Sequence, residues 1–394
     1  MRRTQVLWEA YVRRFEDAFD RYRKGRLTAE EAGELLNLSG RHFRRQCGRF
    51  EAEGVEGLRD RRLGRVSGHR ADEGELERMR RLYKAEYSDF LATHFHEELR
   101  RRHNYKLGYT VTRLALQSAG LVKPAEHRGK HRRKRVRRPM PGMMLFQDGS
   151  THRWIGALDD DIDLIATVDD ATGCIYSAFF VREEGTLSSF TGLLETIRAH
   201  GLFGSFYTDR GSHYFFTPKA GGEVDKKQLT QVGRALSQLG IRHIPSYSPE
   251  GRGRMERVWG TLQQRWPPAL RHAGIRTMDA GNVYLRETLV PEYNARFGKE
   301  PTEEGTAFVA YEGRPLEDVL SVQEDRVVGR DNCVSWYKRS LQIPAQKHRR
   351  HYVKAAVLVH EYPDGALAIF DGPRCLARYD ANGESIDGPA NGAR

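Results

Sequence analysis

The strongest constraint on the fold is an alternation of strand-like and helix-like segments between residues 143 and 264. Short runs rich in β-branched and aromatic residues predict strands, and longer segments with apolar residues at helical spacing predict helices. Their order is βββ-α-β-α-β-α, which is typical of an α/β domain in which helices cover a sheet. The predicted strands are 144–147, 164–168, 175–180, 203–207 and 241–245, and the predicted helices are 187–200, 229–239 and one that begins near Glu256.

Three acidic residues occupy distinctive places in this alternation. Asp148 ends the first predicted strand, Asp209 follows the fourth, and Glu256 lies on the first turns of the last helix. Two carboxylates at strand ends and one on a helix can converge at one edge of a sheet. Because Mg²⁺ and Mn²⁺ prefer carboxylate oxygens and water as ligands, the pattern predicts a divalent-metal site.

Two sequence blocks resemble a known family. Thr-Asp-Arg-Gly-Ser at 208–212 and Ser-Pro-x-Gly-x-Gly-x-x-Glu-Arg at 248–257 are similar to the integrase catalytic core of DDE transposases, most closely the ISNCY type of bacterial insertion sequences. The resemblance implies an α/β ribonuclease-H-like core with a mixed five-stranded sheet. It also implies that Asp148, Asp209 and Glu256 form the catalytic and metal-binding triad. The interval between Asp209 and Glu256 is longer than is usual in this family, and we expect the excess in a surface loop at 215–227.

The same resemblance implies a function. The chain would bind the terminal inverted repeats of a mobile element, cleave its ends and join them to target DNA, using two Mg²⁺ or Mn²⁺ ions about 3.5–4 Å apart. In that scheme Asp148 bridges both ions, Asp209 holds one and Glu256 the other. The implied partners are double-stranded DNA and further copies of the chain in a synaptic complex. Two alternatives stay open: a catalytically silent DNA-binding regulator, and a hydrolytic nuclease such as a ribonuclease.

Composition independently favours a nucleic-acid partner. The 394 residues include 65 Lys and Arg against 53 Asp and Glu, a formal net charge of +12, which favours nucleic acid first and an anionic membrane surface second. No apolar run approaches the roughly 18 residues that span a bilayer, and no secretory signal follows the basic start. Cys47, Cys174, Cys333 and Cys375 are widely separated, which predicts reduced thiols rather than a zinc site. Together with the resemblance to bacterial transposases, these features lead us to expect a bacterial, cytoplasmic protein associated with the nucleoid.

The N-terminal region, residues 1–65, has a helix-turn-helix pattern. Thr28 and Glu31 can form a capping box, residues 37–40 a tight turn, and Ser39 the cap of a second helix. The outward face of that helix is basic and predicts major-groove contacts, although such a face can also be merely solvated. The predicted DNA-contacting residues are Arg41, His42, Arg44, Arg45 and Arg49. Residues 72–125 form a second helix-turn-helix-like domain, either DNA-reading or a structural spacer.

Residues 126–140 form a linker with the densest basic run in the chain. Its predicted phosphate contacts are Arg132, Arg133, Lys134 and Arg135. Each neutralised phosphate would add about −0.9 to the slope of the logarithm of the DNA-binding constant against the logarithm of the salt concentration. Three further candidates flank Glu256, namely Arg252, Arg254 and Gln263, and each could instead be a plain surface residue.

Several other residues are given structural roles. Asp169 and Asp170 precede Gly173 and are interpreted as hairpin-turn residues rather than metal ligands. His213 is interpreted as a hydrogen-bonded structural residue and Trp259 as a core residue. Beyond the catalytic core at 141–300, alternating short β-rich runs and turn signals at 320–380 predict a small β-barrel with a basic loop at 347–351, followed by a flexible tail at 381–394.

Overall fold

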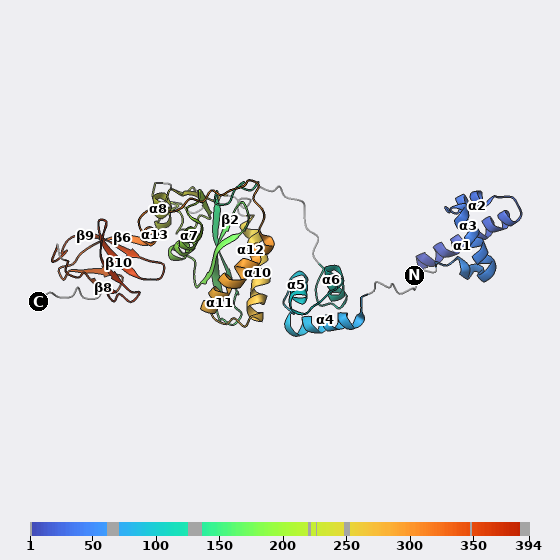
Figure 1. Cartoon of the computed structure of the whole chain (residues 1–394), viewed down its shortest axis with the longest axis horizontal. Coiled ribbons are helices and arrows are strands. Elements are labelled where there is room, and N and C mark those ends of the chain that lie inside the picture. The colour runs from blue at the N-terminus through green and yellow to red at the C-terminus, as the bar shows by residue number, and fades with distance from the viewer. Residues whose placement is uncertain are drawn as a thin grey trace. The chain divides into compact units, whose positions relative to one another are not determined.

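The computed structural model describes residues 2–60, 71–124, 136–219, 222–225, 227–247, 253–346 and 349–386 (Figure 1). The chain divides into two compact units, Met1–Glu73 and Gly74–Arg394. No helix among these residues combines the length and the apolar character that crossing a bilayer requires. Several predicted features lie outside the described residues: the linker contacts Arg132, Arg133, Lys134 and Arg135, the candidate Arg252, and residues 347–348 and 387–394.

The first unit contains helices α1 (Arg2–Arg23), α2 (Ala29–Leu35) and α3 (Gly40–Glu53) and the 3₁₀ helix η1 (Gly54–Leu58). The predicted Thr28–Glu31 capping box is present, and the Ser39 side chain accepts a hydrogen bond from the backbone N–H of His42. The turn between α2 and α3 is tight. A Cβ added to Gly33 would lie 2.7 Å from the carbonyl oxygen of Leu38, so the close approach requires glycine.

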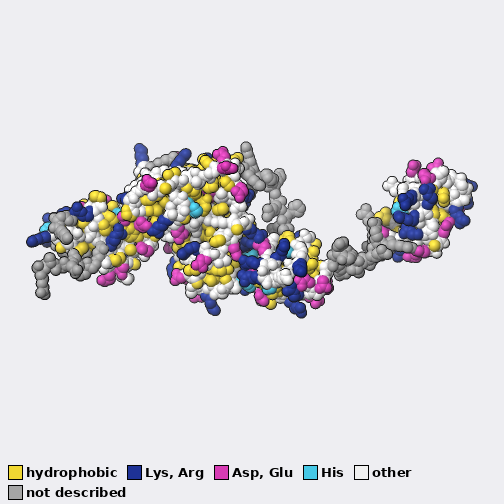
Figure 2. All heavy atoms as spheres, viewed as in Figure 1, with side chains coloured by type: hydrophobic (Ala, Val, Ile, Leu, Met, Phe, Trp, Pro, Cys, Tyr) yellow, Lys and Arg dark blue, Asp and Glu magenta, His cyan; other side chains and the backbone are white. Residues whose placement is uncertain are grey.

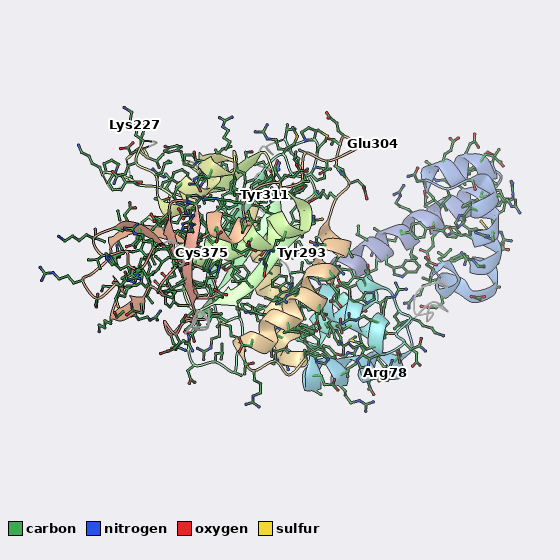
Figure 3. All side chains as sticks on the ribbon, turned by 60° about the vertical axis from the view of Figure 1, so that its left-hand side comes forward. Arg78, Lys227, Tyr293, Glu304, Tyr311 and Cys375 are labelled. Atoms are coloured by element: carbon green, nitrogen blue, oxygen red, sulfur yellow. The ribbon has the colours of Figure 1, made fainter. Side chains whose placement is uncertain are left out.

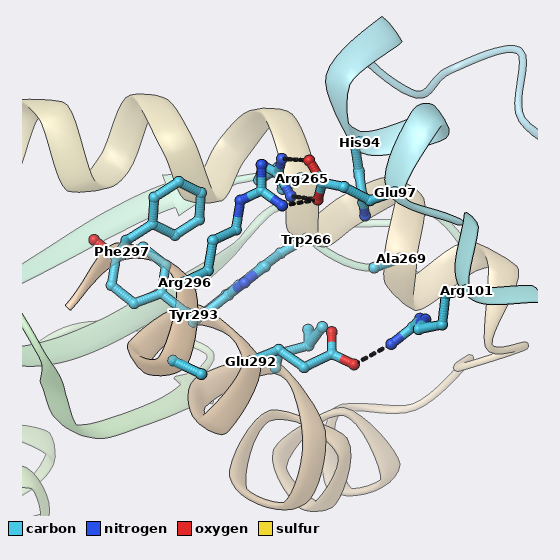
Figure 4. A pocket seen from close by; sticks show the side chains of 12 residues that line it. His94, Glu97, Arg101, Arg265, Trp266, Ala269, Glu292, Tyr293, Arg296 and Phe297 are labelled. Carbon is cyan, nitrogen blue, oxygen red and sulfur yellow. Dashed lines mark hydrogen bonds and ion pairs between the residues drawn. The ribbon is translucent and has the colours of Figure 1, made fainter. Parts of the chain in front are cut away.

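The second unit begins with three helices, α4 (Glu73–Glu86), α5 (Ala92–Arg102) and α6 (Tyr109–Ser118). They pack against the α/β core through ion pairs that Figure 4 shows. Arg265 donates to both carboxylate oxygens of Glu97 at 3.0 Å. Arg101 pairs with Glu292, and these two residues line one pocket of about 360 Å³ together with Arg265 and Glu97. Because these arginines are matched by glutamates from the facing helices, we interpret the pocket as part of a docking interface.

The core is built on a five-stranded sheet with the order β3-β2-β1-β4-β5. β1 pairs antiparallel with β2 and β2 with β3, whereas β1 and β5 each pair parallel with β4. The sheet is therefore mixed and five-stranded, as the family resemblance implies. The strands are β1 (Leu145–His152), β2 (Ile162–Asp169), β3 (Ile175–Val181), β4 (Ser205–Thr208) and β5 (Arg242–Pro245).

Helices cover both faces of this sheet (Figure 1). Adjacent residues of β1 point to opposite faces, so Leu145 joins one hydrophobic core and Phe146 the other. α7 (Thr186–His200) and α8 (Gln231–Gln238) pack on the Leu145 face. The elements on the Phe146 face are α10 (Met255–His272), α11 (Met278–Tyr284), the π-helix η2 (Leu285–Leu289) and α12 (Val290–Phe297).

One strand boundary differs from the prediction in a way that matters for the site. β1 does not end at Asp148 but continues to His152, because its polar second half pairs with β2 up to Ile162. Asp148 therefore lies within the strand. The side chains of Asp148 and Ser150 point to the same face of the sheet, since they are two residues apart.

The segment between the core and the C-terminal region is bound to the core by backbone hydrogen bonds. The backbone N–H of Lys299 donates to the backbone carbonyl of Thr172 at 2.9 Å, and that of Ala307 donates to the backbone carbonyl of Pro141 at 2.8 Å. Val309 and Leu202 exchange a pair of backbone hydrogen bonds. Tyr311, labelled in Figure 3, lies in this segment.

The predicted C-terminal β-barrel is not confirmed, because the described strands form two open sheets. One is a four-stranded antiparallel sheet with the order β11-β10-β9-β6, and the other is the β7–β8 hairpin. Within the described region each hairpin strand pairs only with the other, so the ring of strand pairs does not close. The hairpin still covers the sheet, since Trp336 and Leu341 share a hydrophobic core with Ile369. The elements are α13 (Leu316–Val319), β6 (Val322–Val327), β7 (Cys333–Trp336), β8 (Arg339–Gln342), β9 (Ala356–Glu361), β10 (Leu367–Asp371) and β11 (Arg374–Tyr379).

The core of the first unit gives a testable prediction. Phe43 is fully buried and contacts the rings of Phe15 and Tyr22, with centroid distances of 5.6 and 5.4 Å. We expect Phe43→Ala to lower the free energy of unfolding of this unit by about 3–5 kcal/mol, because it leaves a cavity. Hydrogen exchange of the α2 and α3 amides in the full chain would measure the loss. The exposed Arg45→Ala is the control, and unchanged protection in Phe43→Ala would contradict the assigned core.

Candidate active site

The pairing of β1 with β4 brings two of the predicted acidic residues together. Phe146 and Tyr207 are partners in this parallel pair, and Asp148 and Asp209 each lie two residues beyond them in the chain. Both aspartates line one small cavity with Gln147, Thr208 and Met255. The backbone N–H of Gly211 donates to Asp209 Oδ1 at 2.8 Å and so orients that carboxylate immediately after the strand.

Helix α10 contacts strand β1 through two side-chain hydrogen bonds. Trp259 Nε1–H donates to Asp148 Oδ2 at 2.9 Å, and Gln263 Nε2 donates to Ser150 Oγ at 3.0 Å. The helix therefore runs along β1 in a defined register. Glu256 is exposed and lies one turn before Trp259, at a spacing that puts the two on neighbouring parts of the helix surface.

Trp259 is a functional candidate that sequence reasoning missed. An indole on the apolar side of a helix reads as a core residue, and its side chain is indeed buried. The available signal was its spacing of three residues from Glu256, because residues three apart share a helix face. Its N–H donor orients the carboxylate of Asp148, which lines the small cavity shared with Asp209.

The donor chemistry of the site fits a hard divalent cation, since both residues that meet are carboxylates. Asp148 and Asp209 would hold such an ion. Across the described ranges, however, no group of three or more His, Cys, Asp or Glu side chains lies close enough to hold a metal. Glu256 is thus near the pair along α10 but not gathered with it, and residues 248–252 just before it lie outside the described part.

A fourth carboxylate, Glu184, borders the site on the side of Gly149. A Cβ added to Gly149 would lie 2.3 Å from Glu184 Oε2, so only glycine leaves the carboxylate in its place. Glu184 Oε1 is 3.5 Å from His213 Nε2. No sequence pattern distinguishes Glu184, because it lies in the irregular segment before α7. His213 therefore faces an acidic neighbour beside the site.

Buried polar groups support the strands that carry the two aspartates. The Tyr214 hydroxyl donates to Gln147 Oε1 at 2.9 Å, and burial raises the pKa of this tyrosine well above its ordinary value. His243 Nε2 lies 3.0 Å from Oγ1 of Thr208, the residue that precedes Asp209 in the chain. Burial, with a smaller contribution from His213, lowers the pKa of His243 to about 3, so its ring stays neutral. These groups hold the site by hydrogen bonds that do not change charge near neutral pH.

The rival carboxylates Asp169 and Asp170 are engaged in structural bonds. Asp169 Oδ2 accepts from the backbone N–H and the hydroxyl of Thr172, both at 2.8 Å, as expected for a turn residue. Burial raises the pKa of Asp169, although these hydrogen bonds act in the opposite direction. Asp170 is fully buried and forms an ion pair with Arg254, whose guanidinium is therefore bound here to protein rather than exposed for DNA.

The other predicted DNA contacts differ in their exposure. On α3, Arg41, Arg44 and Arg45 are exposed, whereas His42 and Arg49 are half-buried. Lys and Arg side chains gather on the face of this unit that Figure 2 shows. The Arg44 guanidinium lies 3.0 Å from the Glu30 carboxylate of α2, and so part of the basic face is locally neutralised. Their contact with DNA stays a prediction.

Two known proteins are similar to the chain over most of its length, whereas no protein-family model matches it. A Sinorhizobium fredii (strain NBRC 101917 / NGR234) protein named "Putative transposase y4bF" is 32% identical over 349 residues, which cover 88% of this chain and 75% of the relative. The transposase for insertion sequence IS1202 of Streptococcus pneumoniae is 26% identical over 386 residues, which cover 87% of this chain and 81% of the relative.

Solved structures show weaker similarity. A simian T-cell lymphotropic virus intasome, in complex with PP2A regulatory subunit B56 gamma, has 15% identity and a TM-score of 0.33, and the match covers 72% of this chain and 92% of that one. The HTLV-2 integrase catalytic core domain in complex with magnesium has 15% identity and a TM-score of 0.28, with coverages of 38% and 89%. Because these TM-scores are low, the assignment of the chain depends on the two sequence relatives.

The hydrogen bond between Trp259 and Asp148 gives a second prediction. Trp259→Phe keeps an aromatic ring in the core but removes the N–H donor. We expect the affinity for Mn²⁺ to fall about 10-fold, as is typical when a group that orients a metal ligand is lost. Calorimetric titration of the full chain would measure it. Trp266→Phe, at another buried tryptophan of α10, is the matched control, and equal affinities for both variants would contradict a specific role of Trp259.

Proposed function

Because the chain belongs to the family of insertion-sequence transposases, we propose that it cleaves the ends of a mobile DNA element and joins them to target DNA. The observation that supports this proposal most directly is the pairing of β1 with β4, which sets Asp148 beside Asp209 at one cavity. α10 lies along the same strand and carries Glu256 one turn from the tryptophan that binds Asp148. The reaction class is polynucleotidyl transfer.

In the proposed site, Asp148, Asp209 and Glu256 hold two Mg²⁺ or Mn²⁺ ions. Such ions, when bound, activate the attacking oxygen and stabilise charge on the leaving oxygen of the phosphodiester. Trp259 keeps Asp148 in one orientation, and the N–H of Gly211 does the same for Asp209. Across the described residues, no third acidic side chain is gathered with the two aspartates, and Glu256 is exposed. The Glu256 side chain must therefore turn toward Asp148 and Asp209 to complete the proposed metal site.

The proposed substrate is double-stranded DNA. The net charge of +12 favours a polyanion, and the exposed arginines of α3 follow a tight turn in the manner of a recognition helix. We assign the terminal inverted repeats to the N-terminal unit and target DNA to the core. Two ends must be joined in one event, so we propose that further copies of the chain assemble on the DNA.

One observation favours a second candidate, a DNA-binding regulator that does not cut. The described residues do not gather three acidic ligands into a metal site. A regulator needs the exposed basic face of α3 but not the closed triad. The two candidates differ in one measurable property, which is cleavage of end DNA in the presence of a divalent cation.

The third prediction separates these functions. Wild-type protein with Mg²⁺ and labelled DNA carrying the element's own ends should give joined product. Asp209→Asn should lower product by at least about 1,000-fold, because it removes a carboxylate ligand of the metal site, while end binding stays unchanged. A gel-based strand-transfer assay measures both properties.

The control for this assay is Asp279→Asn, at an exposed aspartate in the first turn of α11. It should retain wild-type activity. End binding without cleavage by the wild-type protein would support the regulator instead. Cleavage that survives Asp209→Asn would mean that the site is elsewhere.

A further inference from the structure

The Asp170 carboxylate is a buried junction between three segments of the core. Its side chain is fully buried, and Oδ1 forms an ion pair with Arg254 Nη1. Oδ2 accepts the backbone N–H of Arg138 at 2.7 Å. The backbone N–H of Asp170 donates to the carbonyl of Met144 at 3.0 Å, directly before β1. One residue thus connects the start of β1, the start of α10 and the end of the basic linker.

The Arg254 guanidinium is held at this junction by more than its charge. Nη1 also donates to the backbone carbonyl of Asp170 at 3.0 Å. The same carbonyl accepts from Arg137 Nη1 at 2.9 Å. The Arg254 side chain is only 11% exposed, so its ion pair with Asp170 is shielded from water. Loss of either partner would leave a buried charge without compensation, which is strongly unfavourable.

The position of Arg254 makes this pair relevant to the candidate site. Arg254 immediately precedes Met255, the first residue of α10, and Glu256 is the next residue. Met255 is buried beside Asp148 and Asp209. The side chain of Arg254 makes no capping hydrogen bond to the helix and instead attaches the residue before the first turn to the buried Asp170.

We propose that Asp170 is a positioning residue that sets Glu256 relative to Asp148. It does so because it binds the start of α10 through Arg254 and the start of β1 through Met144. This inference rests on the proposed function only for its consequence, which is closure of the metal site. Asp170 itself is not a metal ligand, since both of its carboxylate oxygens are occupied by protein donors.

The test compares Asp170→Asn with wild type, Glu256→Gln and a matched control in the full chain. The control is Asp318→Asn, because Asp318 is also a buried aspartate facing an arginine, Arg378, but lies in the C-terminal region. Two properties are measured: hydrogen exchange of the amides at 253–259, and the dissociation constant for Mn²⁺ by calorimetric titration.

We expect Asp170→Asn to raise exchange at 253–259 at least 10-fold and to weaken Mn²⁺ binding to the level of Glu256→Gln. Asp318→Asn should leave both properties at wild-type values. Arg254→Lys keeps the charge but replaces the guanidinium, whose Nη1 donates to both the carboxylate and the backbone carbonyl of Asp170, so it should give an intermediate result. That variant also decides the matter if Asp170→Asn does not fold.

Three outcomes would overturn either the positioning role of Asp170 or the proposed metal site. Unchanged exchange at 253–259, or faster exchange with Mn²⁺ affinity kept at the wild-type value, would overturn the positioning role. Absence of Mn²⁺ binding by the wild-type protein would overturn the proposed metal site. In that case the exchange measurement would still decide whether Asp170 anchors α10.

Discussion

The parallel pairing of β1 with β4 is the interaction on which the rest of the candidate site depends. The strand pairing fixes the register of the two strands, and Asp148 and Asp209, each two residues beyond the paired Phe146 and Tyr207, line one cavity. A shift of one residue would turn one carboxylate to the opposite face of the sheet. Hydrophobic packing on both faces holds the register, since Leu145 and Phe146 belong to different cores. The elements around the pair, including α10 with its bond from Trp259 to Asp148, are arranged relative to this frame.

Much of this arrangement is predictable from the sequence because it depends on local patterns. Strand and helix order follows from the spacing of apolar residues, and the N-terminal helices follow from caps such as Thr28 and Ser39. The extent of β1 is not local. Its second half, Gly-Ser-Thr-His at 149–152, has little strand preference and becomes a strand only because β2 pairs with it. The predicted barrel is not confirmed for a related reason, since closure depends on which distant strands pair.

The environment of individual arginines is also not predictable from local sequence patterns. Arg254 and Arg41 look alike in a sequence, yet one is bound to a buried carboxylate 84 residues away and the other is exposed. An excess of positive charge therefore predicts a polyanionic partner for the whole chain, but it does not tell which arginines face that partner. The same holds for acidic residues, because Glu184 borders the site without a sequence signal, whereas Asp170 has an organising role inside the protein.

We propose that Asp148, Asp209 and Glu256 form one divalent-metal site. A crystal structure of the full chain with end DNA and Mn²⁺, with ions located by anomalous scattering, tests it most directly. We expect ions within about 2.0–2.3 Å of oxygens of Asp148 and Asp209, with the Glu256 side chain turned inward as the third ligand of the metal site. Ions bound elsewhere, for example at the acidic run 159–163 or at Glu184 without Asp148, would contradict it.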